Sequence, residues 1–291
     1  MRPLKIIVLA KQVPDTRHVG SDAMKPEGTV NRAKLATVFN PDDLHALELA
    51  LNIKDRIKGT KVIVVTMGPR KAADIIREGY YRGADDGIMV SDRRFGGADT
   101  LATSYTLIKA IQKLAPFDLI LGGRQAIDGD TAQVGPQCAE KLHIPQVTYV
   151  EEVLEVNDNE IIARRRLEKG VETVSAPLPC LMTVHGSSPD CRSRHAKNLM
   201  KYKYARTKTE LKSADELLLS LHEKRPYLTI PEWSVEDIEA ELEKIGLSGS
   251  PTKVKSVENI VLTASEAKLL SDSDEDVELM VKELIEHHII G

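Results

Sequence analysis

The chain has 291 residues, with 42% hydrophobic and 29% charged side chains, a size that predicts one or two domains. Its 40 basic and 44 acidic residues give a net charge of −4, which argues against a highly basic nucleic-acid-binding protein and against a long disordered acidic chain. Three cysteines cannot build a disulfide framework, and no apolar run approaches the ~20 residues of a membrane helix, so we expect a cytoplasmic protein without a membrane span. Aromatic residues make up only 4% of the chain, which predicts an aliphatic core.

Short aliphatic runs alternate with helical patterns in the first half of the chain. The runs lie at residues 5–11, 61–67, 87–91 and 118–122. Continuously apolar strands are typical of sheets buried on both faces, and strand–helix alternation is typical of parallel sheets covered by helices. We therefore predict an α/β fold with a doubly wound, mainly parallel, Rossmann-like sheet.

The first predicted helix has a clear start signal. Asn40 suits the capping position, Pro41 suits the first helical position, and two acids complement the positive helix end, namely Asp42 and Asp43. A stripe at helical spacing predicts its core face: Leu44, Leu47 and Leu51. Further helices are predicted at about residues 69–82, at about 99–114 and from about Thr131. In the 99–114 helix, we expect three side chains to face the core: Leu101, Tyr105 and Ile108.

After Pro145 the pattern changes to extended segments. Residues 147–156, 160–166 and 171–174 have strand patterns, and 157–159 is a hairpin-type turn, which together predict an antiparallel addition to the sheet.

The last third of the chain separates its charges. Positions 192–208 contain seven lysines and arginines and no acid, whereas 266–286 contains eight acids and two lysines. A flexible joint is predicted at 246–252, ahead of a C-terminal helical arm with an apolar face made of Val277, Met280, Val281, Leu284 and Ile285. The chain thus divides into an α/β domain, residues 1–245, and a joint with an arm, residues 246–291, that we expect to pack on another protein.

The segment 122–136 carries the strongest binding signal. It follows a buried strand, so it lies at the carboxyl edge of the sheet, where open α/β folds bind ligands. Asp130 with Gln133 resembles a capping box at the start of a helix whose free N–H groups suit a phosphate, although Pro136 removes one donor. The segment matches neither a Walker A loop nor G-x-G-x-x-G, and an ordinary strand-to-helix loop is the alternative.

Two other helix starts give weaker signals. Gly96-Gly97 precedes a helix that carries three hydroxyls on one side, those of Thr100, Thr103 and Ser104. These hydroxyls suit a diphosphate, and the alternative is an ordinary solvated helix start. At residues 40–43 the two carboxylates oppose a phosphate, so this end suits an uncharged adenine or ribose, or is only a helix cap. No residue pattern supplies a catalytic acid, base or nucleophile, and no spacing is typical of a metal site. The residues indicate a nucleotide-binding α/β protein without catalytic side chains.

Six short motifs spread over nearly the whole chain carry a family resemblance. They lie at 11–15, 40–41, 65–69, 82–85, 123–131 and 133–135. Together they resemble the β subunit of electron-transferring flavoproteins. The resemblance implies a heterodimer with an α subunit and an adenine nucleotide bound in the β subunit.

The family has two branches, and the resemblance favours one of them. Classical members hold AMP in the β subunit and one FAD in the α subunit, whereas electron-bifurcating members hold a second FAD in the β subunit. Residues 92–104 and 246–254 resemble the bifurcating version. That version implies a hydride from NADH as the input, a high-potential acceptor reached through the α-subunit FAD, and ferredoxin or flavodoxin as the low-potential acceptor.

The resemblance also assigns site residues, with the flavin itself supplying the chemistry. It implies that the adenosine is bordered by Leu9, Asn40, Asp42 and Met67, and that the flavin end is served by Asp99, Thr100 and Thr103. It implies that the phosphates are wrapped by Gly123, Arg124, Gln125, Asp128, Gly129, Asp130, Thr131, Gln133, Val134, Gly135, Pro136 and Gln137, with Arg124 offsetting diphosphate charge or lying near the isoalloxazine.

The basic segment 185–208 matches the loop by which this family docks an acyl-CoA dehydrogenase or another flavin dehydrogenase. Its tip, 194–197, lacks an apolar anchor such as leucine, and residues 217–227 look longer than the family norm. Two alternatives to the bifurcating subunit stay open: a carrier subunit with a structural AMP, and an adenine-nucleotide-binding sensor resembling universal stress proteins.

Overall fold

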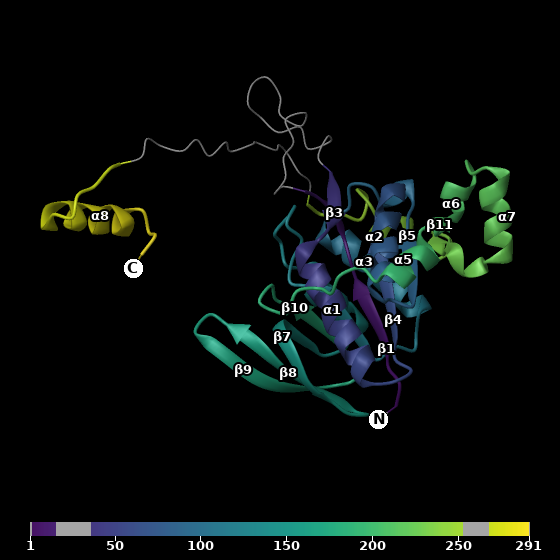
Figure 1. Ribbon diagram of the computed structural model, residues 1–291, viewed down its shortest axis with the longest axis horizontal. Coiled ribbons are helices and arrows are strands. Elements are labelled where there is room, and N and C mark those ends of the chain that lie inside the picture. The colour runs from purple at the N-terminus through teal and green to yellow at the C-terminus, as the bar shows by residue number, and fades with distance from the viewer. Residues whose placement is uncertain (1, 16–35, 253–267, 291) are drawn as a thin grey trace, which may run out of the picture.

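The computed structural model describes residues 2–15, 36–252 and 268–290. Its centre is a nine-stranded sheet in the order β13-β5-β4-β1-β6-β10-β7-β8-β9 (Figure 1). From β13 to β7 neighbouring strands are parallel, whereas β8 pairs antiparallel with β7 and β9 pairs antiparallel with β8. The strands are β1 (Lys5–Leu9), β4 (Lys61–Met67), β5 (Asp86–Val90), β6 (Leu119–Gly123), β7 (Gln146–Val156), β8 (Glu160–Leu167), β9 (Gly170–Pro177), β10 (Cys180–Val184) and β13 (Glu232–Trp233). The predicted α/β class with an antiparallel addition is confirmed.

Helices cover both faces of the sheet. Alternate side chains of β1 divide between two apolar clusters, with Ile6 and Val8 in one and Ile7 and Leu9 in the other. The first cluster includes side chains of α1 (Pro41–Arg56) and α2 (Ala73–Arg82), and the second includes side chains of α3 (Thr100–Lys113) and α4 (Val134–Leu142). This division is the doubly wound arrangement that continuously apolar strands predict.

Two helix predictions need correction. Helix α2 begins at Ala73 and is preceded by a 3₁₀ turn, η3 (Arg70–Ala72), rather than beginning at 69. On α3 the side chain of Leu101 is 40% exposed, so it does not face the core as expected. The helix is rotated so that small side chains such as Ala102 and Ser104 are buried instead. The leucine stripe of α1 is confirmed at Leu47 and Leu51, while Leu44 is partly buried against the same core.

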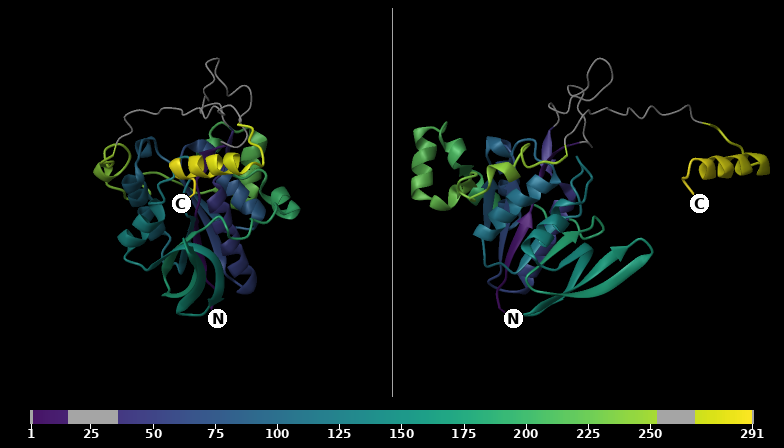
Figure 2. Two further views of the ribbon diagram at one scale, coloured as in Figure 1. Left: turned by 90° about the vertical axis from the view of Figure 1, so that its left-hand side faces the viewer. Right: turned by 180° about the vertical axis from the view of Figure 1, so that it is seen from behind.

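Strand β10 was not predicted, although it is fully buried and parallel between β6 and β7. The short strands β2 (Gln12–Pro14) and β3 (Thr37–Phe39), which pair with each other, and β13 were also missed. By contrast, the predicted hairpin turn is confirmed, because the Asn157 side chain accepts the N–H groups of Asn159 and Glu160. The hairpin β7–β8 and strand β9 extend away from the helices as a wing (Figure 2).

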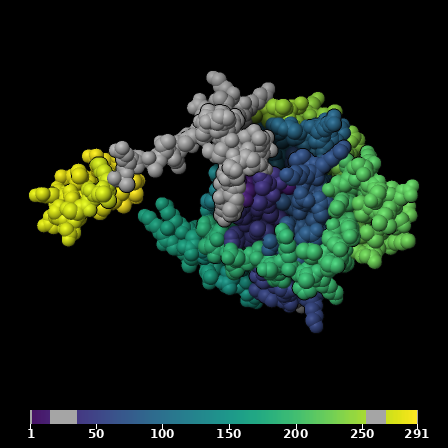
Figure 3. Space-filling model, turned by 45° about the horizontal axis from the view of Figure 1, so that its top comes forward, coloured from purple at the N-terminus to yellow at the C-terminus, as the bar shows by residue number. Residues whose placement is uncertain are grey.

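Residues 208–228 form an insertion, here called the excursion, whose two ends lie side by side on the α/β domain. Strand β11 (Arg206–Thr207) pairs with β12 (Thr229–Ile230) and closes the base of this excursion. Between them lie α6 (Lys208–Leu211), α7 (Glu216–Lys224) and η5 (Pro226–Leu228), which protrude beside α5 (Ala196–Tyr202) (Figures 1 and 3). This excursion contains the segment 217–227, which the resemblance to the family predicts to be longer than usual.

The C-terminal part follows η6 (Leu242–Lys244). The sequence predicts a flexible joint at 246–252, whereas in the structure this segment packs against residues 94–99. Helix α8 (Asp274–Glu286) confirms the predicted helical arm; none of its residues is buried, and it stands apart from the sheet (Figures 1 and 3). Among the described residues, no helix is long and apolar enough to cross a membrane.

Candidate functional site

The predicted site residues gather at the carboxyl edge of the parallel strands. Leu9 ends β1, Met67 ends β4 and Gly123 ends β6. Leu9 and Met67 belong to the same apolar cluster, and Val134 at the start of α4 packs against it. This edge therefore has an apolar floor on the α3–α4 face of the sheet, with polar loops above it.

The first turn of α1 holds the loop that follows β6. The Asn40 side chain donates to the Gln125 carbonyl at 2.8 Å and accepts the Ile127 N–H at 3.2 Å. Asn40 is completely buried and makes no side-chain capping bond, so the prediction that its side chain caps α1 is wrong. Its backbone carbonyl begins the helix, and its amide side chain is used to fix the loop.

Asp43 holds the two strand ends beneath that loop. One carboxylate oxygen accepts the Lys11 N–H at 2.8 Å, and the other accepts the Gly123 N–H at 2.9 Å. Burial raises the pKa of this carboxyl from 3.8 to about 7, against the opposing effect of these hydrogen bonds. The sequence assigned Asp43 only to the helix dipole, and no feature of the pattern distinguished its inward direction from that of Asp42.

The close contact between β6 and α1 requires glycine at one position. A Cβ on Gly123 would lie 2.5 Å from an oxygen of Asp43 and 2.6 Å from the Cβ of Asp42. At Gly129, in contrast, no atom lies within 4 Å of such a Cβ. Only the first of these loop glycines is therefore explained by close approach.

Arg124 lies at the start of the loop and has a donor to spare. Its Nε lies 3.7 Å from a carboxylate oxygen of Asp42, and its guanidinium lies over the ring of Tyr149, 5.9 Å from the ring centroid. This Nε is buried without a hydrogen-bond partner among the described residues. The hydroxyl of Thr66, near the end of β4, is likewise buried without a hydrogen-bond partner there. Unpaired buried polar atoms are rare, so their presence at this edge suits a bound polar group.

Helix α4 begins three residues later than the predicted capping box requires. Asp130 accepts a hydrogen bond from the Gln125 side chain, and both Asp130 (φ 49°) and Ala132 (φ 52°) have left-handed backbone conformations. The chain cannot be helical there, so the predicted Asp130–Gln133 capping box is wrong. Gln133 occupies the N-cap position of α4, but its side chain makes no hydrogen bond to the first-turn N–H groups. The first-turn amides of Val134 and Gly135 therefore stay available to a phosphate.

The remaining loop residues form an exposed tip over residues 128–131. Within it, the carboxylate of Asp128 forms an ion pair with Lys11 at 2.7 Å. Gly129 and Thr131 are also exposed, so both are placed where a bound molecule could contact them.

The starts of α3 and α4 are joined by their polar side chains. Thr100 donates its hydroxyl proton to Gln133 at 2.8 Å, Gln137 donates to the Thr100 oxygen at 3.4 Å, and Ser104 donates to Gln137 at 3.0 Å. The predicted hydroxyl face therefore exists, with Thr100 and Ser104 directed at α4 and Thr103 half-buried on the same helix.

The loop before α3 is held from behind by the C-terminal segment. The Asp99 carboxylate caps α3 by accepting the N–H groups of Leu101 and Ala102, and its other oxygen accepts from Thr252. Gly246 has a φ of 52°, and a Cβ there would lie 2.0 Å from the Arg94 carbonyl oxygen. These contacts explain the glycines of the predicted joint by close packing, and they make Asp99 a residue that holds the loop in place.

Comparison with known proteins identifies the family. The family model described as electron transfer flavoprotein domain matches residues 27–211. The chain is 43% identical to the caffeyl-CoA reductase-Etf complex subunit CarD of Acetobacterium woodii, over 86% of both chains. It is 40% identical to the acryloyl-CoA reductase electron transfer subunit gamma of Anaerotignum propionicum, over 99% of this chain and 100% of the relative. It is 41% identical to the electron transfer flavoprotein subunit beta of Megasphaera elsdenii, over 87% of both chains.

This chain belongs to the electron transfer flavoprotein family and is a β-type subunit. The predicted family is therefore confirmed, and a stress-protein-like sensor is no longer a candidate.

The segment expected to dock a partner in this family, 185–208, uses part of its charge internally. Arg192 pairs with Glu48 and Asp55, and Arg194 pairs with Glu78. Other charges of the segment stay exposed, namely Lys197, Lys201 and Lys208. Two large hydrophobic side chains are exposed there as well, Met200 at 61% and Tyr204 at 45%.

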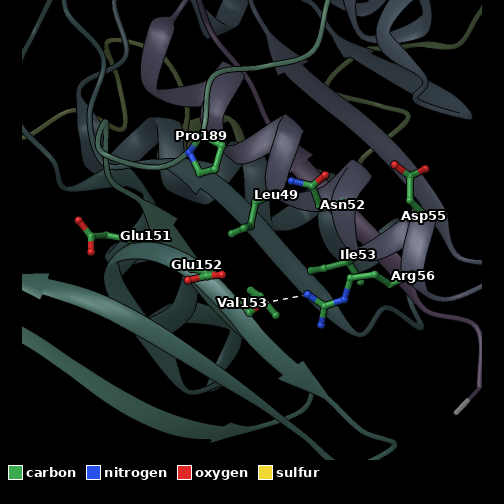
Figure 4. A pocket seen from close by; sticks show the side chains of 9 residues that line it. All are labelled: Leu49, Asn52, Ile53, Asp55, Arg56, Glu151, Glu152, Val153 and Pro189. Atoms are coloured by element: carbon green, nitrogen blue, oxygen red, sulfur yellow. Dashed lines mark hydrogen bonds between the residues drawn. The ribbon is translucent and has the colours of Figure 1, made fainter.

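Two cavities lie beside α1 and α3. One of about 280 Å³ lies between α1 and β7, where Arg56 donates to the Val153 carbonyl and three acids line the opening (Figure 4). The other, of about 500 Å³, lies between α3 and residues 243–251. No residue of the predicted site lines either cavity, although Leu101 and Ser250 bring the second beside the start of α3.

Proposed function

We propose that this chain is the β subunit of an electron-bifurcating electron-transferring flavoprotein, a heterodimer that binds FAD at the carboxyl edge described above and takes a hydride from NADH there. One electron passes to a high-potential acceptor through the α-subunit FAD, and the other passes to ferredoxin or flavodoxin. Two relatives are named as parts of a caffeyl-CoA reductase-Etf complex and of an acryloyl-CoA reductase, which supports a partner of the flavin dehydrogenase or enoyl-CoA reductase class.

The observation that carries the proposal is the joined start of α3 and α4. The 2.8 Å hydrogen bond from Thr100 to Gln133 places two helix N-termini side by side, and each carries a partial positive charge. AMP has a single phosphate, for which one helix start is enough. FAD has a diphosphate and a ribityl chain, which need a second positive helix end and further hydroxyl and amide partners.

The residues at this edge fit an adenine dinucleotide. Val134 and Gly135 have amides for a phosphate, and the free Nε of Arg124 adds a charged donor. Leu9 and Met67 offer aliphatic surface to the adenine. Bound FAD would supply the hydride-accepting and one-electron chemistry, and the protein would position it.

The arm supports a permanent partner subunit. The apolar side chains of α8 are unburied, with Val277, Met280 and Ile285 each more than 40% exposed. A helix with one apolar face is stable only when that face is covered. We propose that the α subunit covers it, in line with relatives named as subunits of complexes.

The deciding experiment is the cofactor content of the purified heterodimer. We expect two FAD per heterodimer, and we expect NADH to bleach the absorbance of both under anaerobic conditions. One FAD with one AMP, and no bleaching by NADH, would show a classical carrier subunit instead. Heterodimer assembled without residues 268–291 is expected to dissociate more readily, which tests the role of the arm.

A further inference from the structure

We propose that Asp43 is a positioning residue for the adenine nucleotide: its carboxylate ties the ends of β1 and β6 together and so sets the path of the loop that wraps the phosphates. The inference rests on the proposed function only in requiring an adenine nucleotide at this edge, whether FAD or AMP.

The hydrogen bonds of Asp43 replace the sheet ladder where that ladder ends. The last paired residues of β1 and β6 are Leu9 and Gly122. Beyond them the strands separate, which is how open α/β sheets form a binding crevice. Asp43 accepts the N–H of Lys11 at 2.8 Å and of Gly123 at 2.9 Å, one with each oxygen. An ionised carboxylate accepts both bonds, whereas a neutral amide or acid has only one good acceptor for them.

Asn40 continues the same function further along the loop. Its side chain fixes Gln125 and Ile127, two and four residues beyond the strand end that Asp43 holds. The first turn of α1 thus sets both the beginning and the middle of the phosphate loop. Neither side chain needs to touch the nucleotide to control where Arg124 and the α4 amides lie.

The carboxylate has an energetic cost that favours a role in binding. In the part of the chain that the structure describes, no cation lies within ion-pair distance of Asp43, and burial raises its pKa from 3.8 to about 7. Between these two pH values the unfolded chain releases the proton and the native chain keeps it. Stability therefore falls as the pH rises from 3.8 to about 7 and is constant above. A group that lowers stability at a crevice is typical of functional sites.

The neighbouring charges do not remove this effect. Asp42 on α1 disfavours ionisation of Asp43. The side chain of Arg124 is directed at Asp42, and the ammonium group of Lys11 is held by Asp128. We therefore expect protonation of Asp43 as the pH falls through about 7, with loss of one of its two amide bonds.

The experiment measures the rate at which the αβ heterodimer releases adenine nucleotide, by timed gel filtration and chromatography of the retained nucleotide at pH 6 to 8. Asp43→Asn is expected to release one equivalent about tenfold faster than wild type, the size of one charge-assisted hydrogen bond, and to keep the other. Asp118→Asn is the matched control, because Asp118 accepts the Lys5 N–H at 2.7 Å at the opposite ends of the same two strands. It is expected to release nucleotide at the wild-type rate.

The pH profile separates positioning from a purely structural role. Wild-type release is expected to accelerate as the pH falls from 8 to 6, and the profile of Asp43→Asn is expected to be flatter, with the titration of the nucleotide phosphates common to both. Release from Asp43→Asn at the wild-type rate, or a wild-type profile without acceleration, would overturn the proposal. If Asp43→Asn does not assemble, Asp43→Ser, which has a single acceptor oxygen, takes its place in the same comparison. Recovery of AMP in place of FAD would contradict the proposed function and leave this measurement intact.

Discussion

The two ends of the parallel sheet use the same kind of bond in different ways. At the amino ends, Asp118 accepts the Lys5 N–H and pairs with Arg2, and Asp85 accepts the Val62 N–H and pairs with Lys54. At the carboxyl ends, Asp43 accepts two backbone N–H groups and has no cation within ion-pair distance among the described residues. Carboxylates thus bind backbone N–H groups of the strands at both ends of the sheet. Only at the amino ends is the charge of these carboxylates paired with an arginine or a lysine.

The difference shows where the protein trades stability for binding. The amino ends are closed by hydrogen bonds and ion pairs, which leave no reason for a ligand. The carboxyl ends keep a buried carboxylate, an unpaired Arg124 Nε, an unpaired Thr66 hydroxyl and an uncapped helix start on α4. All of these cost free energy in the unliganded protein. The Arg124 Nε, the Thr66 hydroxyl and the α4 amides gain hydrogen-bond partners when a polar ligand binds, whereas Asp43 serves to position the loop.

The strongest test of this contrast is Gly123→Ala. The new Cβ would lie 2.5 Å from the Asp43 carboxylate and 2.6 Å from the backbone of Asp42, so α1 and the strand end must separate. We expect a loss of about 2–3 kcal/mol in the free energy of unfolding, together with loss of the bound nucleotide. Denaturant unfolding of the heterodimer and its nucleotide content measure the two effects.

Gly129→Ala provides the control for that substitution. It lies in the same loop, yet no atom lies within 4 Å of its added Cβ. We expect a change within about 0.5 kcal/mol and normal nucleotide content. Equal effects of the two substitutions would mean that loop flexibility, and not close approach at the strand end, determines binding.

A smaller effect is expected from Thr100→Val. The substitution keeps the side-chain volume but removes the hydroxyl that joins the starts of α3 and α4. Loss of one neutral hydrogen bond near the diphosphate is expected to weaken retention of the β-subunit FAD roughly fivefold, or about 1 kcal/mol. The FAD content after dilution and gel filtration measures it.

Thr106→Val is the matched hydroxyl deletion on the same helix. Thr106 is completely buried and donates to the Ala102 carbonyl, one turn away within α3. We expect it to leave FAD retention unchanged. Unchanged retention in Thr100→Val would instead argue that the α3–α4 contact is only a packing contact, and would weaken the preference for FAD over AMP.

The same contrast explains what could be predicted from the sequence. Continuously apolar strands are predictable because both of their faces are buried in the sheet. Helices with an apolar stripe are predictable because only one face is buried, which leaves a pattern with the helical period. Strand β10 has the same five-residue length as β5 and β6, but it follows the antiparallel strands instead of continuing the strand–helix alternation that marked the others. Its position between β6 and β7 depends on chain topology, which no local pattern contains.

At the site, the sequence located the edge but not the direction of its side chains. Asp42 and Asp43 are identical residues in one helical turn, yet the docking of α1 turns only Asp43 inward. Asp130 and Gln133 have capping-box spacing, but two left-handed residues delay the helix. Leu101 has core spacing, but α3 presents small side chains inward because Gln137 of α4 comes close enough to bond with Ser104. Each miss depends on how two elements pack, which is tertiary information.

The smallest effect is predicted for Arg2→Ala, at the amino ends. Arg2 pairs with Asp118 at 2.5 Å, but its side chain is 49% exposed, and exposed ion pairs contribute at most about 1 kcal/mol. We expect a decrease of less than about 1 kcal/mol in unfolding free energy, further reduced at high salt because mobile ions screen the pair. Nucleotide retention and its pH profile are expected to match wild type, as measured in the same heterodimer. A change in retention from this distant pair would mean that the two ends of the sheet are coupled through β1 and β6, so that the carboxylates at the amino ends also contribute to the binding edge.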